Sequence, residues 1–393
     1  MRPAARLQSA IELLDAIIIA ARDNGPSADQ LAKRFFAERR YAGSKDRRSV
    51  RDLAWSAIRQ FGERPDNARA AFIALSDKDP ELAALFDGSD YGPAAIGSDE
   101  TRASGGLLPQ WLLPHFASLV DETERKALLD RAPLDLRVNA LKASREAVVA
   151  EFPEAQTPLQ SPFALRLPTG QAIDNHPAIL EGRAEIQDLG SQLIIDACAA
   201  KPGMTVLDLC AGAGGKTLGL ASYMTGKGRL IATDTNRGRL DQLKPRSNRA
   251  GALEIETVLL NPGKEREMLR DLAGACDVVL VDAPCSGSGT WRRNPETRWR
   301  LNPARLKQVI AAQVNLLSIA SEMVAPGGRL VYAVCSLLDD EGRGQMTAFL
   351  DGNNGWHSAA VALPAGRVHG DGVLLTPHHD GTDGFYFAKM QKL

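Results

Sequence analysis

Two short apolar runs in this chain each lead into a cysteine. Residues 277–282 precede Cys285, and residues 328–334 precede Cys335. From residue 186 onward, strand and helix patterns alternate, which predicts a parallel sheet with helices on both faces. Ligands of such sheets bind outside the carboxyl ends of the strands, so residues at two strand ends can converge on one reacting atom. The pattern therefore predicts an α/β domain with two thiols at its binding edge.

A cysteine beside an apolar strand is usually a small, buried hydrophobic residue, so neither thiol alone would indicate chemistry. The chain has five cysteines, an odd number with no C-x-x-C pair. This argues against a disulfide framework and against a zinc site, and it is typical of a reduced, cytosolic protein. We therefore expect no metal. Cys285 and Cys335 differ from the other three cysteines in their surroundings, because each lies just past the end of an apolar run and downstream of a glycine-rich turn.

The glycine-rich turn follows the apolar residues 205–209 and extends from Cys210 to Thr217, where a helix begins. Glycines permit a tight turn and close approach of the backbone to a ligand, and the helix N-terminus offers unpaired amides. A Walker A loop would need glycine at Cys210, and a dinucleotide turn would need glycine at Thr217. Neither of these phosphate-binding motifs is present.

The next strand pattern, residues 228–234, ends in Asp234. A lone aspartate in a loop is usually a turn former. Beside a glycine-rich turn, however, a carboxylate at this point can accept hydrogen bonds from ribose hydroxyls. A ribose site without a pyrophosphate turn points to S-adenosylmethionine rather than NAD.

Positive charge is concentrated in two segments. Residues 33–64 carry ten Lys or Arg against four acids, and residues 291–300 interleave two tryptophans with four arginines. A solvated helical face is the usual explanation for a charge run alone. Arginines with aromatic rings are also the mixture that binds single-stranded RNA. We expect RNA contacts from five arginines, namely Arg47, Arg48, Arg292, Arg293 and Arg298.

The patterns predict four regions along the 393 residues. Residues 1–76 show helical spacing of apolar positions and predict an all-helical domain. Residues 77–106 are acidic and rich in small residues, as in a linker. Residues 107–184 are mixed α and β, and residues 185–393 carry the alternating pattern.

The longest apolar stretch near the N-terminus, residues 11–21, contains Glu12 and Asp15. It is far shorter than the roughly 20 apolar residues that a membrane span requires. It also lacks the cleavage pattern of a signal peptide, so we expect a cytoplasmic chain with no membrane partner.

Taken together, the glycine-rich turn and the two cysteine segments resemble those of the Nop/Sun (RsmB-like) RNA cytosine-5 methyltransferases. The resemblance rests on residues 208–217, 281–289, 330–336 and 383–387, and it extends upstream through residues 134–139 and 187–191. Residues 41–48 and the surrounding helices are similar to the NusB-like RNA-binding domain of bacterial members. The family usually has proline at Ala213, threonine at Val334 and an acid at Asn261.

The resemblance implies a Rossmann-like class I S-adenosylmethionine-dependent methyltransferase core, an all-helical N-terminal domain and a small mixed α+β subdomain between them. It assigns the nucleophile to Cys335, assistance with product release to Cys285, and contact with the base to Asp282. The cofactor residues that it implies are Cys210, Ala211, Gly212, Ala213, Gly214, Gly215, Lys216, Asp234, Asn261 and Asp282.

The chemistry agrees with this assignment. Carbon 5 of cytosine is a poor nucleophile, and a thiolate that adds to carbon 6 activates it. We therefore expect the product to be 5-methylcytosine in ribosomal RNA. We also expect the enzyme to be a monomer. Transfer RNA is an alternative substrate, and a non-catalytic ribosome assembly factor is an alternative function. The joint presence of Cys285, Cys335, Asp282 and Asp234 argues against the second alternative, because such a factor needs none of them.

Overall fold

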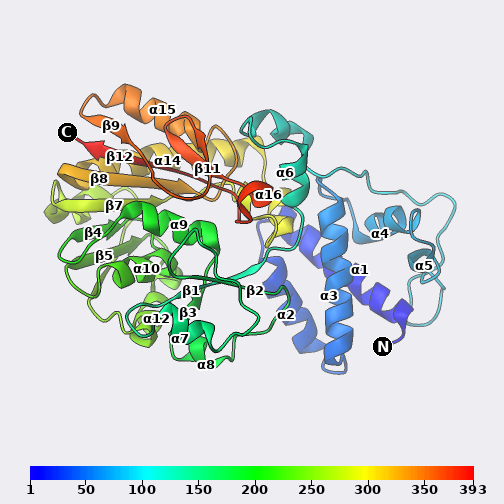
Figure 1. Cartoon of the computed structure of the whole chain (residues 1–393). Coiled ribbons are helices and arrows are strands. Elements are labelled where there is room, and N and C mark those ends of the chain that lie inside the picture. The colour runs from blue at the N-terminus through cyan, green and yellow to red at the C-terminus, as the bar shows by residue number, and fades with distance from the viewer. The chain divides into compact units, whose positions relative to one another are not determined.

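The computed structural model describes residues 1–393 and divides the chain into two compact units (Figure 1). The helical unit comprises Met1–Phe116, Asp121–Asp130 and Thr290–Asn302. The sheet unit comprises Ala117–Val120, Arg131–Gly289 and Pro303–Leu393. This division differs from the predicted regions, because a segment that follows Cys285 directly in the sequence belongs to the helical unit.

The helical unit is built from short and medium helices around an apolar core. Ser27 and Asn67 cap two of these helices by accepting hydrogen bonds from the amides of Gln30 and Ala70. Leu14, Ile58 and Phe72 are among its fully buried side chains. Its helices are α1 (Pro3–Arg22), α2 (Ala28–Glu38), α3 (Ser44–Gln60), α4 (Ala68–Ser76), α5 (Pro80–Ala83), η1 (Gln110–His115), α6 (Glu122–Ala127) and η4 (Pro295–Arg300). Helix α5 and the core residue Phe86 lie within the predicted linker, so residues 77–106 are part of this unit.

Helix η4 is fixed to the other helices of this unit by side chains from the arginine and tryptophan cluster. Arg298 donates to the carbonyl oxygens of Ile58 (2.6 Å) and Phe61 (3.0 Å), and the Trp299 indole donates to that of Phe61 (2.8 Å). Arg300 donates to the carbonyl oxygens of residues 25 and 26. The carbonyls at the end of a helix lack partners within it, and cationic side chains satisfy them well. The cluster therefore completes the end of α3.

This arrangement corrects part of the predicted RNA-binding set. Arg298 is 1% exposed and Arg292 is 6% exposed, whereas RNA contact requires accessible guanidinium groups. Arg293 is half-buried. The two predicted arginines on α3, Arg47 and Arg48, are exposed, and the Arg47 side chain donates to the carbonyl oxygen of Ala42 (2.8 Å).

The main sheet of the sheet unit has nine strands, with the order β10-β11-β12-β8-β7-β4-β5-β6, and β9 also pairs with β12. Strands β8, β7, β4, β5 and β6 are parallel, and β12 is antiparallel to β8. The bounds are β4 (Thr205–Asp208), β5 (Arg229–Asp234), β6 (Ile255–Leu259), β7 (Cys276–Asp282), β8 (Val324–Val334), β9 (Trp356–Ala359), β10 (Arg367–His369), β11 (Gly372–Leu375) and β12 (Phe385–Lys392). The chain fills one side of β4 with β5 and β6 and then the other side with β7 and β8. The strand order therefore reverses beside β4, which is where open α/β sheets bind ligands.

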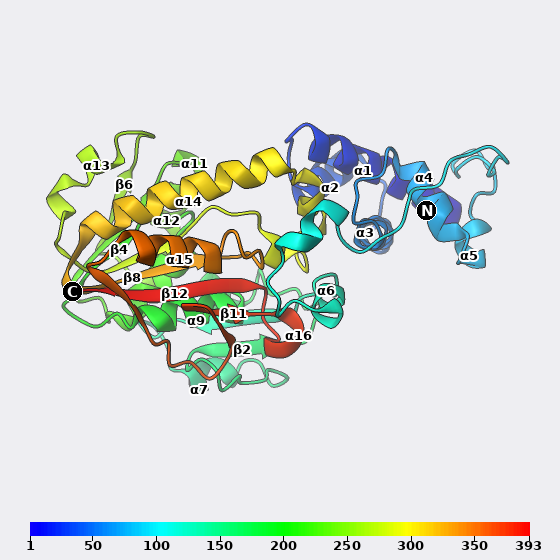
Figure 2. The same ribbon diagram turned by 90° about the horizontal axis from the view of Figure 1, so that it is seen from above.

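Helices pack on the main sheet: α9 contacts β8 and β12, and α14 contacts β7 and β8 (Figure 2). The helices of the sheet unit are α7 (Arg145–Val149), α8 (Pro177–Leu180), α9 (Leu189–Cys198), α10 (Gly215–Tyr223), α11 (Arg237–Leu240), α12 (Leu243–Ala250), α13 (Glu265–Met268), η2 (Arg270–Leu272), η3 (Ser288–Thr290, which ends in the helical unit), α14 (Pro303–Met323), α15 (Arg343–Gly352) and α16 (Pro377–Asp380). This architecture confirms the predicted Rossmann-like class.

A second, antiparallel sheet has the order β2-β1-β3 and its own small core. Its strands are β1 (Leu134–Val138), β2 (Ala164–Leu167) and β3 (Ala184–Ile186). Strands β1 and β2 lie within residues 107–184, the region predicted to be mixed α and β, and β3 begins at its last residue. No helix anywhere in the chain combines the length and the apolar character that crossing a membrane demands.

We predict that Arg298→Ala lowers the free energy of unfolding of the helical unit by about 1–3 kcal/mol, because buried carbonyl groups lose their donors. Arg48→Ala should change it by less than about 0.5 kcal/mol, because that side chain is exposed. Urea denaturation followed by tryptophan fluorescence measures both values. Unchanged stability of the Arg298 variant together with weaker RNA binding would restore the original prediction for this residue.

Candidate active site

The candidate active site lies where β4, β5, β7 and β8 end at one edge of the main sheet. The glycine-rich turn joins β4 to α10, and Gly214 has φ +83° at the N-cap of that helix. A Cβ atom at Gly214 would lie 2.1 Å from the Leu243 side chain, so the turn and α12 pack this closely only with glycine. The turn therefore brings backbone amides to the sheet edge as the sequence predicts.

Asp234 connects the end of β5 to this turn. Its carboxylate accepts hydrogen bonds from the amides of Gly212 (2.8 Å) and Asn236 (2.7 Å), and the residue is 8% exposed. Each carboxylate oxygen has a second lone pair, which can accept a hydrogen bond from a ligand hydroxyl. Asp234 thus fixes the turn and retains the capacity to bind a ribose.

Two arginines that the sequence reasoning missed hold the turn by its carbonyl groups. Arg137, from β1, donates to the carbonyl oxygen of Gly215 (2.8 Å) and also to the side chain of Gln187. Arg246, from α12, donates to the carbonyl oxygen of Ala213 (2.7 Å) and pairs with Glu185. Burial lowers the pKa of Arg137 to about 10, so it is still a cation at neutral pH. The small sheet therefore helps to shape the binding edge of the main sheet.

Lys216 and Asp282 form an ion pair at this edge, with Nζ and Oδ2 2.7 Å apart. Burial opposes the charged form of Lys216, but Asp282 outweighs this effect, and the pKa of Lys216 lies above its usual value. Lys216 also interacts electrostatically with the sulfur of Cys335. The turn thus contributes a cation that pairs with Asp282 and interacts with one of the two thiols.

The two cysteines meet, as their positions after β7 and β8 predict. Cys285 Sγ and Cys335 Sγ are 3.3 Å apart, and both residues are partly buried. The hydrogen bond with Cys335, followed by burial, raises the pKa of Cys285 well above its usual value. Cys285 is therefore a neutral thiol at physiological pH, and its S–H group can donate to the sulfur of Cys335.

Asp208, which precedes the turn in the sequence, was not among the predicted site residues. Asp208 ends β4, is 1% exposed and accepts a hydrogen bond from the Thr217 hydroxyl (2.6 Å). Burial raises the pKa of Asp208 to about 7, against the opposing effect of Thr217. A part of the population therefore carries a neutral Asp208 near physiological pH.

Other predicted residues contribute less to the geometry. Burial raises the pKa of Cys210 well above its usual value, so its thiol is unreactive and the residue serves the turn through its backbone. The Ala211 amide donates to the carbonyl oxygen of Thr233 (2.8 Å) and joins the turn to β5. Asn261 follows β6 and is exposed, and its backbone amide contacts the sulfur of Met268 (3.3 Å). A role for the Asn261 side chain in cofactor binding stays a prediction.

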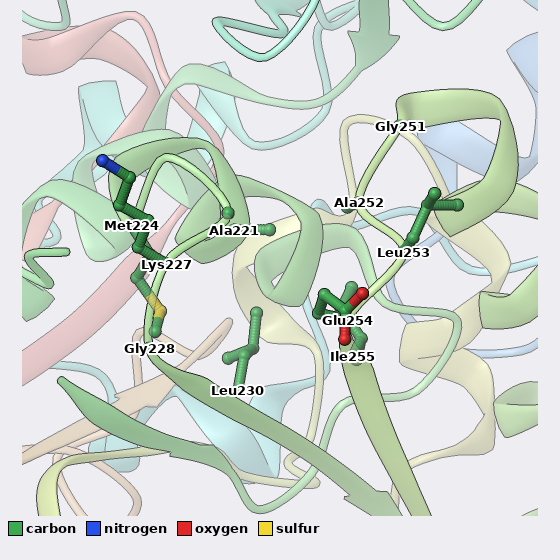
Figure 3. A pocket seen from close by; sticks show the side chains of 11 residues that line it. Ala221, Met224, Lys227, Gly228, Leu230, Gly251, Ala252, Leu253, Glu254 and Ile255 are labelled. Carbon is green, nitrogen blue, oxygen red and sulfur yellow. The ribbon is translucent and has the colours of Figure 1, made fainter. Parts of the chain in front are cut away.

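The pocket drawn in Figure 3 lies elsewhere on the sheet unit. It is lined by residues 221–230, from the end of α10 to the start of β5, and by residues 251–255, which precede and begin β6. It therefore lies at the amino ends of these strands, opposite the edge that carries the thiols. None of the predicted site residues lines it.

A family model described as 16S rRNA methyltransferase RsmB/F matches residues 192–391. The chain belongs to this RsmB/F methyltransferase family. The matched residues contain the glycine-rich turn, Asp234, Asp282, Cys285 and Cys335, so the site described above lies inside the family domain.

Individual relatives support the same family. The chain is 33% identical to the probable ribosomal RNA small subunit methyltransferase B of Synechocystis, over 72% of this chain and 66% of that protein. It is 30% identical to the ribosomal RNA small subunit methyltransferase B of Pectobacterium atrosepticum, over 81% of this chain and 75% of that protein. The chain thus spans about two thirds to three quarters of these relatives' lengths. The crystal structure of PH0851 has the same fold, with a TM-score of 0.77, 23% identity and 98% coverage of both chains.

S-adenosylmethionine is the cofactor of this RsmB/F member. The residues present fit it, since the turn offers helix N-terminal amides and Asp234 offers free acceptor capacity for the ribose. Lys216, at the start of α10, pairs with Asp282 and interacts electrostatically with Cys335. The cofactor site and the candidate nucleophile are therefore parts of one sheet edge.

We predict that Asp234→Ala weakens S-adenosylmethionine binding by about 1–3 kcal/mol, because ligand hydroxyls and the Gly212 amide lose an acceptor. Isothermal titration calorimetry on the folded variant measures this change. Glu256→Gln, which removes an exposed carboxylate on β6 that pairs with Arg229, is the control and should leave the affinity unchanged. Wild-type affinity in the Asp234 variant would refute the ribose assignment.

Proposed function

We propose that this chain transfers a methyl group to carbon 5 of a cytosine in small-subunit ribosomal RNA, through a covalent bond between Cys335 and the base. The observation that carries this proposal is the 3.3 Å contact between two thiols beside the Lys216–Asp282 pair. Family membership and the names of the RsmB relatives support ribosomal RNA as the substrate.

The first step requires a sulfur nucleophile. The Cys335 thiolate attacks carbon 6 of the cytosine, and the displaced electron pair makes carbon 5 nucleophilic. Bound S-adenosylmethionine supplies an electrophilic methyl group. A cation near the sulfur favours such a step, and Lys216 interacts electrostatically with Cys335.

Asp282 is suited to contact the base during this addition. It ends β7 and its side chain is 31% exposed, so a ligand at the sheet edge can reach it. Negative charge develops on the ring as the thiolate adds, and a proton that reaches nitrogen 3 from Lys216 through Asp282 relieves it. Lys216 contacts Asp282 at 2.7 Å and is a cation that can support this charge as well.

Cys285 is suited to the release of the product. After methylation, the proton on carbon 5 passes to a base, and the electrons of that bond expel Cys335. The departing sulfur becomes an anion, and the neutral Cys285 thiol at 3.3 Å can donate a hydrogen bond to it. Burial and the contact with Cys335 raise the pKa of Cys285, which keeps this donor protonated when the Cys335 sulfur is free.

Bisulfite sequencing of ribosomal and transfer RNA, from cells with and without the gene, tests the substrate. We expect one cytosine in small-subunit ribosomal RNA to lose its protection from conversion when the gene is deleted. A lost site in transfer RNA alone would transfer the same chemistry to that substrate. No lost site in either RNA would contradict the proposed activity.

The two thiols should differ in mutant phenotype. We predict that Cys335→Ala abolishes methyl transfer and forms no covalent complex with RNA. Cys285→Ala should still form the complex but release it slowly, so that an RNA–protein adduct persists in denaturing gels. Cys276→Ala, at the buried amino end of β7, is the matched control and should behave as the wild type. Interchanged phenotypes would make Cys285 the nucleophile.

A further inference from the structure

A buried carboxylate that the reaction scheme does not use lies behind the two thiols. Glu341 is 0% exposed. One of its oxygens, Oε1, accepts from the amide of Ser286 (2.7 Å) and from the side chain of Gln313 (3.0 Å). The other, Oε2, accepts from the hydroxyls of Ser286 and Ser336, both at 2.5 Å. Four donors therefore converge on this one side chain.

The donors come from the residues that follow the two cysteines. Ser286 is adjacent to Cys285, and Ser336 is adjacent to Cys335. A single oxygen atom of Glu341 thus joins the loop after β7 to the loop after β8. Ser288 extends the connection, because its hydroxyl lies 3.1 Å from that of Ser336 and accepts from the Leu337 amide (2.9 Å).

The hydrogen bonds around Glu341 match the acceptor capacity of a carboxylate. A carboxylate only accepts, and its two oxygens provide about four lone-pair sites, which match the four donors. A buried charge is costly unless it is fully hydrogen-bonded, and bonds to a charged acceptor are roughly twice as strong as neutral ones. The site therefore contains a strong, directional clamp at the base of both thiol loops.

Gln313 attaches this clamp to helix α14 of the sheet unit. Its amide group donates to Glu341 and to the carbonyl oxygen of Pro284 (3.0 Å), the residue before Cys285. Gln313 belongs to α14, and Glu341 lies two residues before α15, which packs beside α14 (Figure 2). Hydrogen bonds to Glu341 and Gln313 thus connect both thiol loops to the pair of helices α14 and α15.

We propose that Glu341 is a positioning residue that holds Cys285 and Cys335 in mutual contact through Ser286 and Ser336. The catalytic meaning of this contact rests on the proposed function, whereas the contact itself does not. The isosteric substitution Glu341→Gln replaces one acceptor oxygen with an NH₂ donor. At the Oε1 position the NH₂ group would face two donors, and at the Oε2 position it would reverse both serine hydrogen bonds. In either orientation the clamp loses the charge-assisted hydrogen bonds that join the two loops.

The separation of the thiols can be measured without RNA or cofactor. Diamide oxidises two adjacent thiols to a disulfide and is itself reduced to the hydrazine, which takes up both hydrogens. The rate of Cys285–Cys335 cross-linking, followed by mass spectrometry of peptides, reports how often the sulfurs meet in the correct geometry. We expect Glu341→Gln to slow cross-linking about tenfold, because disulfide formation depends steeply on geometry.

Methyl transfer gives the second measurement. Misplacement of a reacting group by about 1 Å can cost 100-fold in rate, so kcat of Glu341→Gln should fall at least about tenfold. KM for RNA and the affinity for S-adenosylmethionine should stay near the wild-type values, because Glu341 contacts neither predicted binding surface. Glu341→Asp, which keeps the charge on a shorter side chain, should recover part of both rates.

Three further variants complete the test. Ser286→Ala and Ser336→Ala each remove one hydroxyl and should slow cross-linking, so they carry the test if Glu341→Gln does not fold. Asp196→Asn is the matched control, because Asp196 accepts from the Tyr223 hydroxyl in the same unit, and it should leave cross-linking unchanged. Wild-type cross-linking in Glu341→Gln, Ser286→Ala and Ser336→Ala would overturn the proposal. Slow cross-linking in a chain that methylates no RNA would retain the clamp and refute only the proposed function.

Discussion

The register between β7 and β8 is the constraint on which the site depends. In this parallel pair, Asp282 lies opposite Ala333, so Cys285 and Cys335 follow three and two residues later. The two thiols thus leave the sheet at nearly the same height. A slip of one residue would shift one strand by about 3.3 Å and turn its side chains to the other face, which would separate the sulfurs. Fully buried neighbours such as Val281 and Tyr332 make such a slip costly.

Four acidic side chains in or near the site accept hydrogen bonds from donors of different kinds. Amides stabilise Asp234, a lysine pairs with Asp282, and four donors surround Glu341, but Asp208 receives only the Thr217 hydroxyl. The pKa of Asp208 is accordingly raised by burial, with a smaller contribution from the nearby Asp282 charge. The same environment keeps Cys285 protonated. Lys216 supplies positive charge that interacts with the Cys335 sulfur.

The sequence predicted the features of the site that depend on local pattern. Apolar runs indicated the strands, so Cys285, Cys335 and Asp234 could be assigned to strand ends, and the glycine spacing indicated the turn. Arg298 was misassigned because arginine beside tryptophan is equally suited to stacking on RNA bases and to capping a helix end. Glu341 and Arg137 were missed because their partners are distant in sequence, 55 residues in the case of Ser286 and 78 in the case of Gly215. Nothing in local composition marks such partners.

Gly289 explains how one loop can serve the site and also lead into the helical unit. Its amide donates to the carbonyl oxygen of Cys335 (3.1 Å), and its carbonyl oxygen accepts from the amide of Gly384 (2.8 Å). A Cβ atom here would lie 1.9 Å from the Gly384 carbonyl oxygen, so no other residue permits this approach. The chain enters the helical unit at the next residue, Thr290. Because Gly289 is held on both sides, the loop of Cys285 is fixed within the sheet unit before the chain leaves it.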